Sequence, residues 1–481
     1  MTPIAILITI LAYFAVLFAV SYLAGRKADS AGFYSGNRQN SWALVAMSTI
    51  GAAISGVTFV SVPGMVQGAA FSYMQMVLGF TVGQILIAYV LIPLFYRLNL
   101  TSIYQYLNHR FSGVSYKTSA WIFFVSKMLG AGVRLFVVSA VLQILVFTPL
   151  GVPFWLNAVL TTLMVYLITF RGGVKSVVWT DLLKTCCLIL SVALCIFFIM
   201  RDGVSLNGLK DSEMGRVFFF DNPKQPTFFW KQFLAGIFLV IATTGLDQDM
   251  MQRTLSCKNF RESQKNMITG AVLQIFVIGL FLVLGYLLYS YAAQQHIDLT
   301  GLKGDDVFPY LATGSYFPMI VGVLFIVGFI AAAYSAAGSA LTALTTSFCV
   351  DILDIQRYDE ARQTKTRAWV HLGMTVIMAS LLCVIYALND DAVIQTVYKV
   401  ASYTYGPLLG MFCFGMFTRF TIRDRWVPLV VIAAPLITWV IDVNSAAWFA
   451  GYQFSHERLL LNAMLTFLGM LCLVNGRQAK L

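Results

Sequence analysis

Small hydroxyl side chains are concentrated in one long apolar stretch, GFIAAAYSAAGSALTALTTSFCVDI, between residues 328 and 352. Small residues allow helix backbones to approach closely inside a membrane. Buried hydroxyl groups supply the neutral oxygens that a hard cation such as sodium needs when it sheds its water. Any one of these hydroxyls could instead bond back to its own helix, so the row points to cation binding only together with the features below. The hydroxyl residues are Ser335, Ser339, Thr342, Thr345, Thr346 and Ser347.

Two basic side chains, Lys127 and Arg134, lie in an apolar run expected to cross the membrane at 118–147. A charge inside a membrane helix is costly unless it is paired, so Arg134 is a candidate for function. The planar fork of an arginine suits a carboxylate, and we therefore expect Arg134 to bind an acidic substrate. Seven residues separate the two side chains, so they lie on one side of a helix, two turns apart. The alternatives are an internal ion pair or a reach to the outer surface for Arg134, and a reach to the cytoplasmic surface for Lys127.

Two apolar runs contain the glycine and proline interruptions that are typical of broken helices. The first is STIGAAISGVTFVSVPG, from Ser48 to Gly64, and the second is IATTGLDQDMMQR, from Ile241 to Arg253. An unwound membrane helix frees backbone carbonyls for a cation and amide hydrogens for an anion. Either segment alone could be a simple kink or a helix end. Interruptions at corresponding places in two halves favour the central site of a transporter built from two inverted repeats of five helices.

The composition places these residues in a membrane protein. Of the 481 residues, 59% are hydrophobic and 11% are charged, whereas soluble domains carry about 25% charged residues. Basic cytoplasmic loops explain the net charge of +11, so we expect no nucleic-acid partner. The eight cysteines form no CxxC pair and the four histidines are scattered, so we expect neither disulfides nor a zinc site. The chain has no phosphate-binding glycine loop or hydrolase motif, so we expect neither an enzyme nor an ATP-driven pump.

The apolar runs predict an all-α integral membrane protein with about thirteen transmembrane helices, because a bilayer is crossed by roughly 20 apolar residues. Basic residues cluster in the loops after every second run, beginning with Arg26 and Lys27. By the positive-inside rule, the N-terminus is outside and the C-terminus is in the cytoplasm. The runs lie near 3–24, 42–67, 74–97, 118–147, 153–170, 177–200, 229–248, 267–293, 315–350, 368–388, 395–418, 426–442 and 459–475.

Four motifs resemble the sodium/solute symporter family, which has the LeuT-type fold. GGVKSVVWTD (172–181) resembles the family's fifth core helix and DQDMMQRTLSCK (247–258) the end of the sixth. AAAYSAAGSALTALTTSFCVDI (331–352) resembles the eighth, and YTYGPLLGMFCFG (403–415) the tenth. The motifs occur in the family's order over most of the chain. The resemblance implies one transmembrane domain with inverted repeats at 42–200 and 229–418, an extra N-terminal helix at 3–24, and two C-terminal helices within 426–475.

The resemblance also implies sodium ligands. The main sodium site would use the backbone carbonyls of Gly51, Ile54 and Ala332 and the hydroxyl of Ser335. A second hydroxyl that relatives place next is absent here, because that position is Ala336.

A second sodium site, which some relatives carry on the aspartate of the fifth core helix and serines of the eighth, would use Asp181 and Ser339. Gly338 replaces a further serine there, so the second site is depleted.

The substrate residues implied by the resemblance lie on three segments. SGVTFVSVP (55–63) is similar to the corresponding stretch of bacterial sialic acid symporters, in which Ser55 and Thr58 would face the ligand. Arg134 falls where those transporters hold the carboxylate of the sugar acid. A glutamine that contacts the substrate in them is replaced by Val77, with Tyr73 and Gln75 nearby. The second interruption adds two further candidates, Thr243 and Thr244.

The depleted second site and the membrane lysine lead to one further expectation. A buried aspartate needs a counter-charge. Lys127 and Asp181 lie at similar depth if both helices start at the cytoplasmic face. We therefore expect the Lys127 ammonium to substitute for a cation at Asp181, which would leave one coupled sodium ion.

These features together predict a sodium-coupled secondary transporter in the plasma membrane, the inner membrane of a bacterium. It would import a small organic solute, a carboxylate or an acidic sugar such as sialic acid, by alternating access. The first alternative is a sodium symporter for a neutral sugar, polyol or amino acid, with a structural Arg134. The second is a sensor with a transporter-like membrane domain. The sequence leaves the oligomeric state open.

Overall fold

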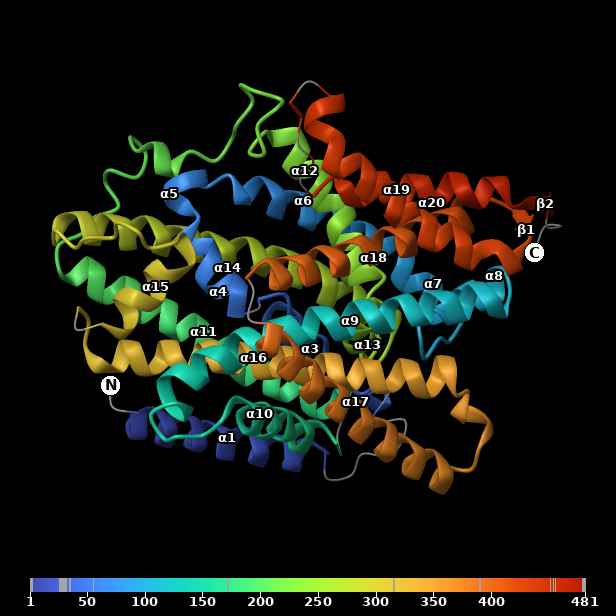
Figure 1. Cartoon of the computed structure of the whole chain (residues 1–481), viewed down its shortest axis with the longest axis horizontal. Coiled ribbons are helices and arrows are strands. Elements are labelled where there is room, and N and C mark those ends of the chain that lie inside the picture. The colour runs from blue at the N-terminus through green and yellow to red at the C-terminus, as the bar shows by residue number, and fades with distance from the viewer. Residues whose placement is uncertain are drawn as a thin grey trace.

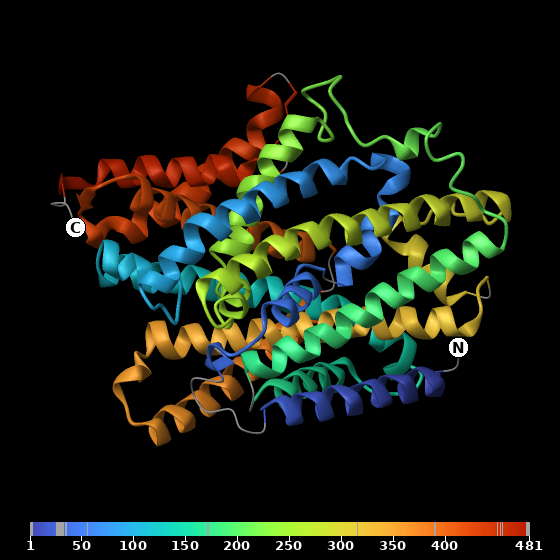
Figure 2. The same cartoon turned by 180° about the vertical axis from the view of Figure 1, so that it is seen from behind.

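The computed structural model is a bundle of long helices that run beside one another along the long axis of the molecule (Figure 1; Figure 2 shows it from behind). A lipid environment favours this form, because a helix satisfies its own backbone hydrogen bonds. The expected helical fold is confirmed. The structure describes residues 3–25, 33, 36–54, 56–170, 173–314, 316–388, 391–449, 451–452, 454 and 456–477.

The helices of the first half of the chain match the expected apolar runs to within a few residues. Short helical turns lie at η1 (Gly36–Arg38), η2 (Ile87–Leu91), η3 (Gln143–Phe147) and η4 (Glu213–Gly215). The α-helices are α1 (Pro3–Gly25), α3 (Trp42–Ala53), α4 (Gly56–Gly64), α5 (Val66–Ala69), α6 (Tyr73–Leu86), α7 (Ile92–Arg97), α8 (Gln105–Arg110), α9 (Gly113–Leu142), α10 (Phe154–Thr169) and α11 (Val174–Arg201).

The second half follows the same pattern. Its short turns are η5 (Ile241–Gly245), η6 (Phe348–Ile352), η7 (Ile355–Arg357) and η8 (Asp424–Trp426). Its α-helices are α12 (Phe229–Val240), α13 (Gln248–Thr254), α14 (Phe260–Gln294), α15 (Gly304–Thr313), α16 (Met319–Ser347), α17 (Glu360–Leu388), α18 (Asp391–Phe417), α19 (Val427–Trp448) and α20 (Arg458–Cys472).

The number of membrane spans agrees with the prediction only in part. Within the described residues, eight helices are long and apolar enough to cross a bilayer, or ten if each of two bent pairs counts as one span. Two further expected spans form shorter apolar helices, α10 and α20, of 16 and 15 residues. The figure of thirteen spans therefore stays a prediction.

Both expected helix breaks are present. The segments Trp42–Ala53 and Thr58–Gly64 are bent by 64° relative to each other, and Phe229–Gly245 and Gln248–Thr254 by 73°. At the second break, the Asp247 side chain caps the new helix by accepting hydrogen bonds from the backbone amides of Asp249, at 2.9 Å, and Met250, at 3.4 Å. An aspartate at this position satisfies amides that a helix start leaves unpaired. The breaks thus turn backbone and side-chain polar groups toward the middle of the bundle.

Close helix packing places α11 against both α3 and α16. At Gly51 in α3, a Cβ atom would lie 2.2 Å from the Thr185 hydroxyl of α11, so only glycine allows this approach. A second close contact joins α6 and α12, where a Cβ on Gly79 would lie 2.2 Å from the backbone oxygen of Phe233. Small residues let membrane helices meet in this way, and the contacts fix the walls of the central site.

The described part of the chain also contains a two-stranded antiparallel sheet, formed by β1 (Phe420–Ile422) and β2 (Val474–Arg477). The strands are short and lie beyond helices α18 and α20, where the apolar patterns end. Three- and four-residue strands carry too few residues for a recognisable alternation, so the sequence did not predict them.

Candidate functional site

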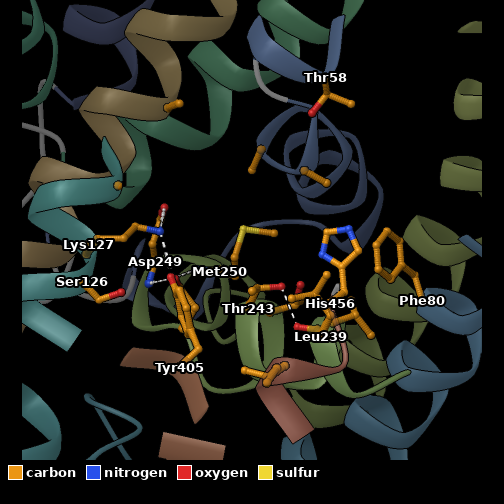
Figure 3. A pocket seen from close by; sticks show the side chains of 18 of the residues that line it. Thr58, Phe80, Ser126, Lys127, Leu239, Thr243, Asp249, Met250, Tyr405 and His456 are labelled. Atoms are coloured by element: carbon orange, nitrogen blue, oxygen red, sulfur yellow. Dashed lines mark hydrogen bonds and ion pairs between the residues drawn. The ribbon is translucent and has the colours of Figure 1, made fainter. Parts of the chain in front are cut away.

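A central cavity of about 420 Å³ lies among residues of α3, α4, α6, α9, η5, α13, α16, α18 and α20. Both broken helices contribute to its wall, as expected for a transporter site. Figure 3 shows Lys127 and Ser126 on one side of it and Phe80 and His456 on the other. We call this space the substrate cavity.

Most of the predicted substrate residues line the substrate cavity. Thr58 comes from the first broken helix, Tyr73 from α6, Arg134 from α9, and Thr243 and Thr244 from η5. The Arg134 side chain is exposed. Among the described residues it has no hydrogen bond or ion pair, although it acts electrostatically on Tyr405 and Lys184. An intramembrane arginine that faces a cavity with its donors unused is suited to an anionic ligand.

The prediction for Gln75 is wrong. Its side chain is buried and spans from α6 to the 219–232 segment. Its amide nitrogen donates to the Thr227 carbonyl at 2.8 Å, and its amide oxygen accepts from the Phe219 backbone at 3.0 Å. Gln75 follows the cavity-lining Tyr73 by two residues, so it lies on the other side of α6, where it holds a connecting segment. Val77 is also fully buried, and Ser55 lies outside the described residues.

The predicted contact of Lys127 with Asp181 is also wrong. The Lys127 ammonium lies 3.0 Å from a carboxylate oxygen of Asp247 and 2.8 Å from one of Asp249. Figure 3 shows Lys127 beside Asp249 and Tyr405. The Tyr405 hydroxyl donates to Asp247 at 2.7 Å. The sharp bend before α13 brings both of these carboxylates to α9, so Lys127 finds partners on the second broken helix.

Asp181 is fully buried and has other partners. Its carboxylate accepts a hydrogen bond from Ser48 at 3.1 Å and one from the predicted sodium ligand Ser335. The Arg253 guanidinium lies 3.5 Å from it. The ammonium of Lys184 donates to the Ser335 hydroxyl at 3.4 Å. We call Ser48, Asp181, Lys184, Arg253 and Ser335 the Asp181 cluster.

The two predicted ligands of the second sodium site have protein partners in this structure, and the site stays a prediction. Ser339, its other predicted ligand, donates a hydrogen bond to Asp249. Asp249 also pairs with Arg253 at 2.8 Å. The oxygens of Asp181 and Ser339 are therefore bonded to different protein groups. Among the described residues, no group of three or more His, Cys, Asp or Glu side chains is placed to hold a metal ion.

The main sodium position has a donor set that sodium could use. Gly51, Ile54 and Ala332 are buried, and their carbonyl oxygens are neutral ligands of the type that hard cations accept. Ser335 donates its proton to Asp181 and accepts from Lys184. A hydroxyl group has two acceptor lone pairs, so one remains on Ser335. Ala336, which replaces the second expected hydroxyl, has only a methyl side chain and lines the substrate cavity.

Sequence reasoning missed five charged or polar residues of this centre. Lys184 could have been found, because it interrupts the apolar run of α11 in the same way that Lys127 interrupts α9. The roles of the other residues depend on the direction of α13 after its bend, which no local pattern gives. The missed residues are Lys184, Asp247, Asp249, Arg253 and Tyr405.

A helical membrane bundle with two broken helices around a polar cavity defines the class of secondary transporters. The chain belongs to the sodium:solute symporter family, whose model matches residues 33–423. A solved structure, a substrate-bound outward-open state of a Na⁺-coupled sialic acid symporter, has the same fold. It gives a TM-score of 0.82 over 98% of this chain and 99% of that chain, at 18% sequence identity. The expected LeuT-type fold is confirmed.

Two relatives illustrate the range of the family. The human sodium-coupled monocarboxylate transporter 1 is 28% identical over 427 residues, which cover 83% of this chain and 66% of that protein. The match thus spans slightly less than two thirds of the human protein. The sodium/sialic acid symporter NanT of Aliivibrio fischeri is 26% identical over 473 residues, which cover 92% of this chain and 88% of that protein.

Proposed function

We propose that this protein imports a small organic carboxylate by sodium-coupled symport. The observation that carries the proposal is Arg134, which faces the substrate cavity and has no hydrogen bond or ion pair among the described residues. An arginine without a partner inside a membrane protein is costly. A substrate carboxylate would supply two acceptor oxygens in the geometry of the guanidinium fork.

The charges around the substrate cavity support an anion over a neutral solute. Four basic side chains and two acidic ones line it. The two acidic side chains, Asp247 and Asp249, are already paired with Lys127, and the basic Arg458 is paired with Asp442. Arg134 is left with its charge available. A neutral sugar or polyol would leave this charge unmatched, which disfavours those two substrates of the first alternative function. An amino acid carries a carboxylate of its own, so for this class the charge of Arg134 is not decisive.

An acidic sugar is our preferred substrate within this class, with sialic acid as the first compound to test. A cavity of about 420 Å³ falls in the range of sites for drug-sized ligands and exceeds what a three-carbon acid fills. Gln84 lines the cavity, and its buried amide oxygen has no hydrogen-bond partner within the described part of the chain. This oxygen could accept a hydrogen bond from a sugar hydroxyl. Monocarboxylates form the comparison group, because one relative is named for their transport.

The sodium ion would bind to the carbonyls of Gly51, Ile54 and Ala332 and to the free lone pair of Ser335. Binding of sodium would stabilise the ends of the broken α3–α4 segment against α16, where the substrate cavity begins. A four-helix bundle would rock against the rest of the protein to expose the substrate cavity to each side in turn.

The proposal includes a multi-pass location in the plasma membrane, with the N-terminus outside and the C-terminus in the cytoplasm. The cluster of basic residues in alternate loops supports this orientation. The lipid bilayer, sodium and the substrate are the partners, and nucleic acid is not. The protein carries its substrate across the membrane unchanged and is not an enzyme.

A ligand screen tests the proposal. The melting temperature of the purified protein is measured with sialic acid, pyruvate, lactate, glucose and proline, each in sodium chloride and in choline chloride of equal concentration. We expect sialic acid to raise the melting temperature, and to do so more strongly in sodium. Stabilisation by glucose and by none of the other compounds would favour a neutral solute and contradict the proposal. Proline counts with the carboxylates in this screen, because its carboxyl group is ionised at neutral pH.

A further inference from the structure

Helix α11 carries a buried lysine, Lys184, that the proposed transport mechanism does not use. Its side chain has no solvent exposure. It follows Asp181 by three residues, so both side chains lie on the same face of α11. A charged group is costly to bury unless it is paired and hydrogen-bonded. The position of Lys184 therefore needs an explanation from its surroundings.

The surroundings of Lys184 are the predicted cation ligands. Its ammonium donates to the Ser335 hydroxyl at 3.4 Å, and that hydroxyl donates to the Asp181 carboxylate. Ser335 and Asp181 are the hydroxyl and the carboxylate that the two expected sodium sites would use. The Lys184 ammonium thus contacts Ser335 of the main site directly, and through this hydroxyl it is linked to Asp181, the carboxylate of the expected second site.

The charges of the buried centre already balance without a second sodium ion. Asp181 faces Arg253 at 3.5 Å, Arg253 pairs with Asp249 at 2.8 Å, and Asp249 pairs with Lys127 at 2.8 Å. Lys127 also pairs with Asp247 at 3.0 Å. With Lys184 included, the connected groups comprise three carboxylates and three bases. An added sodium ion at Asp181 would leave a net positive charge in a buried site, which is unfavourable.

We propose that the Lys184 ammonium is a built-in cation that takes the place of the second sodium ion at Asp181. The protein then couples one sodium ion, held by the carbonyls of the broken α3–α4 segment, to each substrate. This inference rests on the proposed sodium symport and specifies its ion count. Lys127, which the sequence suggested for this role, instead neutralises Asp247 and Asp249.

Counting bound sodium tests the inference without any substrate. Equilibrium dialysis with radioactive sodium is applied to the purified wild-type protein and to Lys184→Met. We expect one sodium ion per chain for the wild type. For Lys184→Met we expect two, because the loss of one positive charge leaves the buried centre with a net negative charge that a second sodium ion can neutralise.

Two control variants separate the effect of the buried charge from other effects. Lys184→Arg keeps the charge and should bind one sodium ion. Lys210→Met removes a lysine from an exposed loop and should also bind one. If Lys184→Met does not fold, a wild-type count of two still overturns the inference, because that count requires no substitution.

The outcomes distinguish this inference from the proposed function. Two sodium ions on the wild type, or one on both the wild type and a folded Lys184→Met, would overturn the inference. No sodium on the wild type together with one on Lys184→Met would uphold the role of Lys184 and would contradict sodium coupling instead. The number of bound sodium ions is measured without substrate, so it does not depend on which acids stabilise the protein in the ligand screen.

Discussion

The substrate cavity and the Asp181 cluster are both polar regions inside an apolar bundle, but they use their charges differently. In the substrate cavity, Arg134 has its donors unused among the described residues. In the Asp181 cluster, the carboxylate has a serine on each oxygen and a guanidinium at 3.5 Å. A charge within a membrane-spanning helix is costly without a partner, so an unused charge that faces a cavity indicates a ligand from outside. A fully partnered charge indicates a structural role or a replaced ion.

The first prediction tests the substrate cavity, the region whose arginine has unused donors. Arg134→Ala should weaken binding of the acidic substrate by at least about 30-fold, because loss of one partner of a hydrogen-bonded charge pair costs about 2–5 kcal/mol. Uptake into proteoliposomes should be abolished. Arg134→Lys should recover binding only in part, since a point charge cannot reproduce the fork.

The control for Arg134 is Arg201→Ala, which removes an exposed arginine at the end of α11 and should leave uptake unchanged. Melting temperatures should show that the Arg134 variants are folded. Normal uptake by Arg134→Ala would remove the basis for an anionic substrate.

The second prediction concerns the ion pairs of Lys127 with Asp247 and Asp249, which lie between the two regions. Lys127→Met should destabilise the protein by about 3 kcal/mol, because it leaves two buried carboxylates without a shared counter-charge. Denaturant unfolding in detergent measures this loss. The double variant Lys127→Met/Asp247→Asn should recover part of it. Equal stability of wild type and Lys127→Met would mean that the pairs contribute nothing to the fold.

The third prediction tests the main sodium position, which shares Ser335 with the Asp181 cluster. Ser335→Ala removes the one predicted side-chain hydroxyl of the main sodium position and frees Asp181 and Lys184 from their shared partner. The sodium concentration for half-maximal uptake should rise roughly tenfold, as expected for the loss of a hydrogen-bonding partner near charged groups, about 1.5 kcal/mol. Ala336→Ser should lower that concentration by supplying an oxygen. A sodium dependence that is the same in all three proteins would place sodium elsewhere.

The fourth prediction, with the smallest expected effect, tests whether Gln75 in α6 has a structural role or binds the substrate. Gln75→Leu should lower stability by about 1 kcal/mol, because backbone groups of Phe219 and Thr227 lose their partner. Substrate affinity should not change, since Gln75 does not line the substrate cavity. Calorimetric binding alongside the unfolding measurement checks both parts. A large loss of affinity with normal stability would return Gln75 to the substrate site.

The sequence predicted the parts of the fold that local chemistry determines. The long apolar runs, the two glycine-rich breaks and the intramembrane Arg134 each carry their signal within a few neighbouring residues. The free-energy cost of placing a charge in a membrane helix also identifies Lys127 as a candidate functional residue from the sequence. Its partners were not predictable, because they depend on the direction that α13 takes after the bend at Asp247.

Two other errors have the same physical origin. Gln75 was placed at the substrate because its residue type and position suited the role, but its side chain bonds to a segment about 150 residues away in the sequence. Ser339 follows a similar pattern, since it bonds to Asp249 across the bundle. Residue type indicates that a buried polar group needs a partner, and only the packing of the helices decides which partner it finds.

The central claim is that Arg134 holds the carboxylate of the substrate. Titration calorimetry of the wild-type protein with sialic acid and with its uncharged methyl ester, both in sodium chloride, tests it most directly. We predict that the ester binds at least about 30-fold more weakly than the acid, and that Arg134→Ala removes this difference. Equal binding of acid and ester to the wild-type protein would contradict the claim.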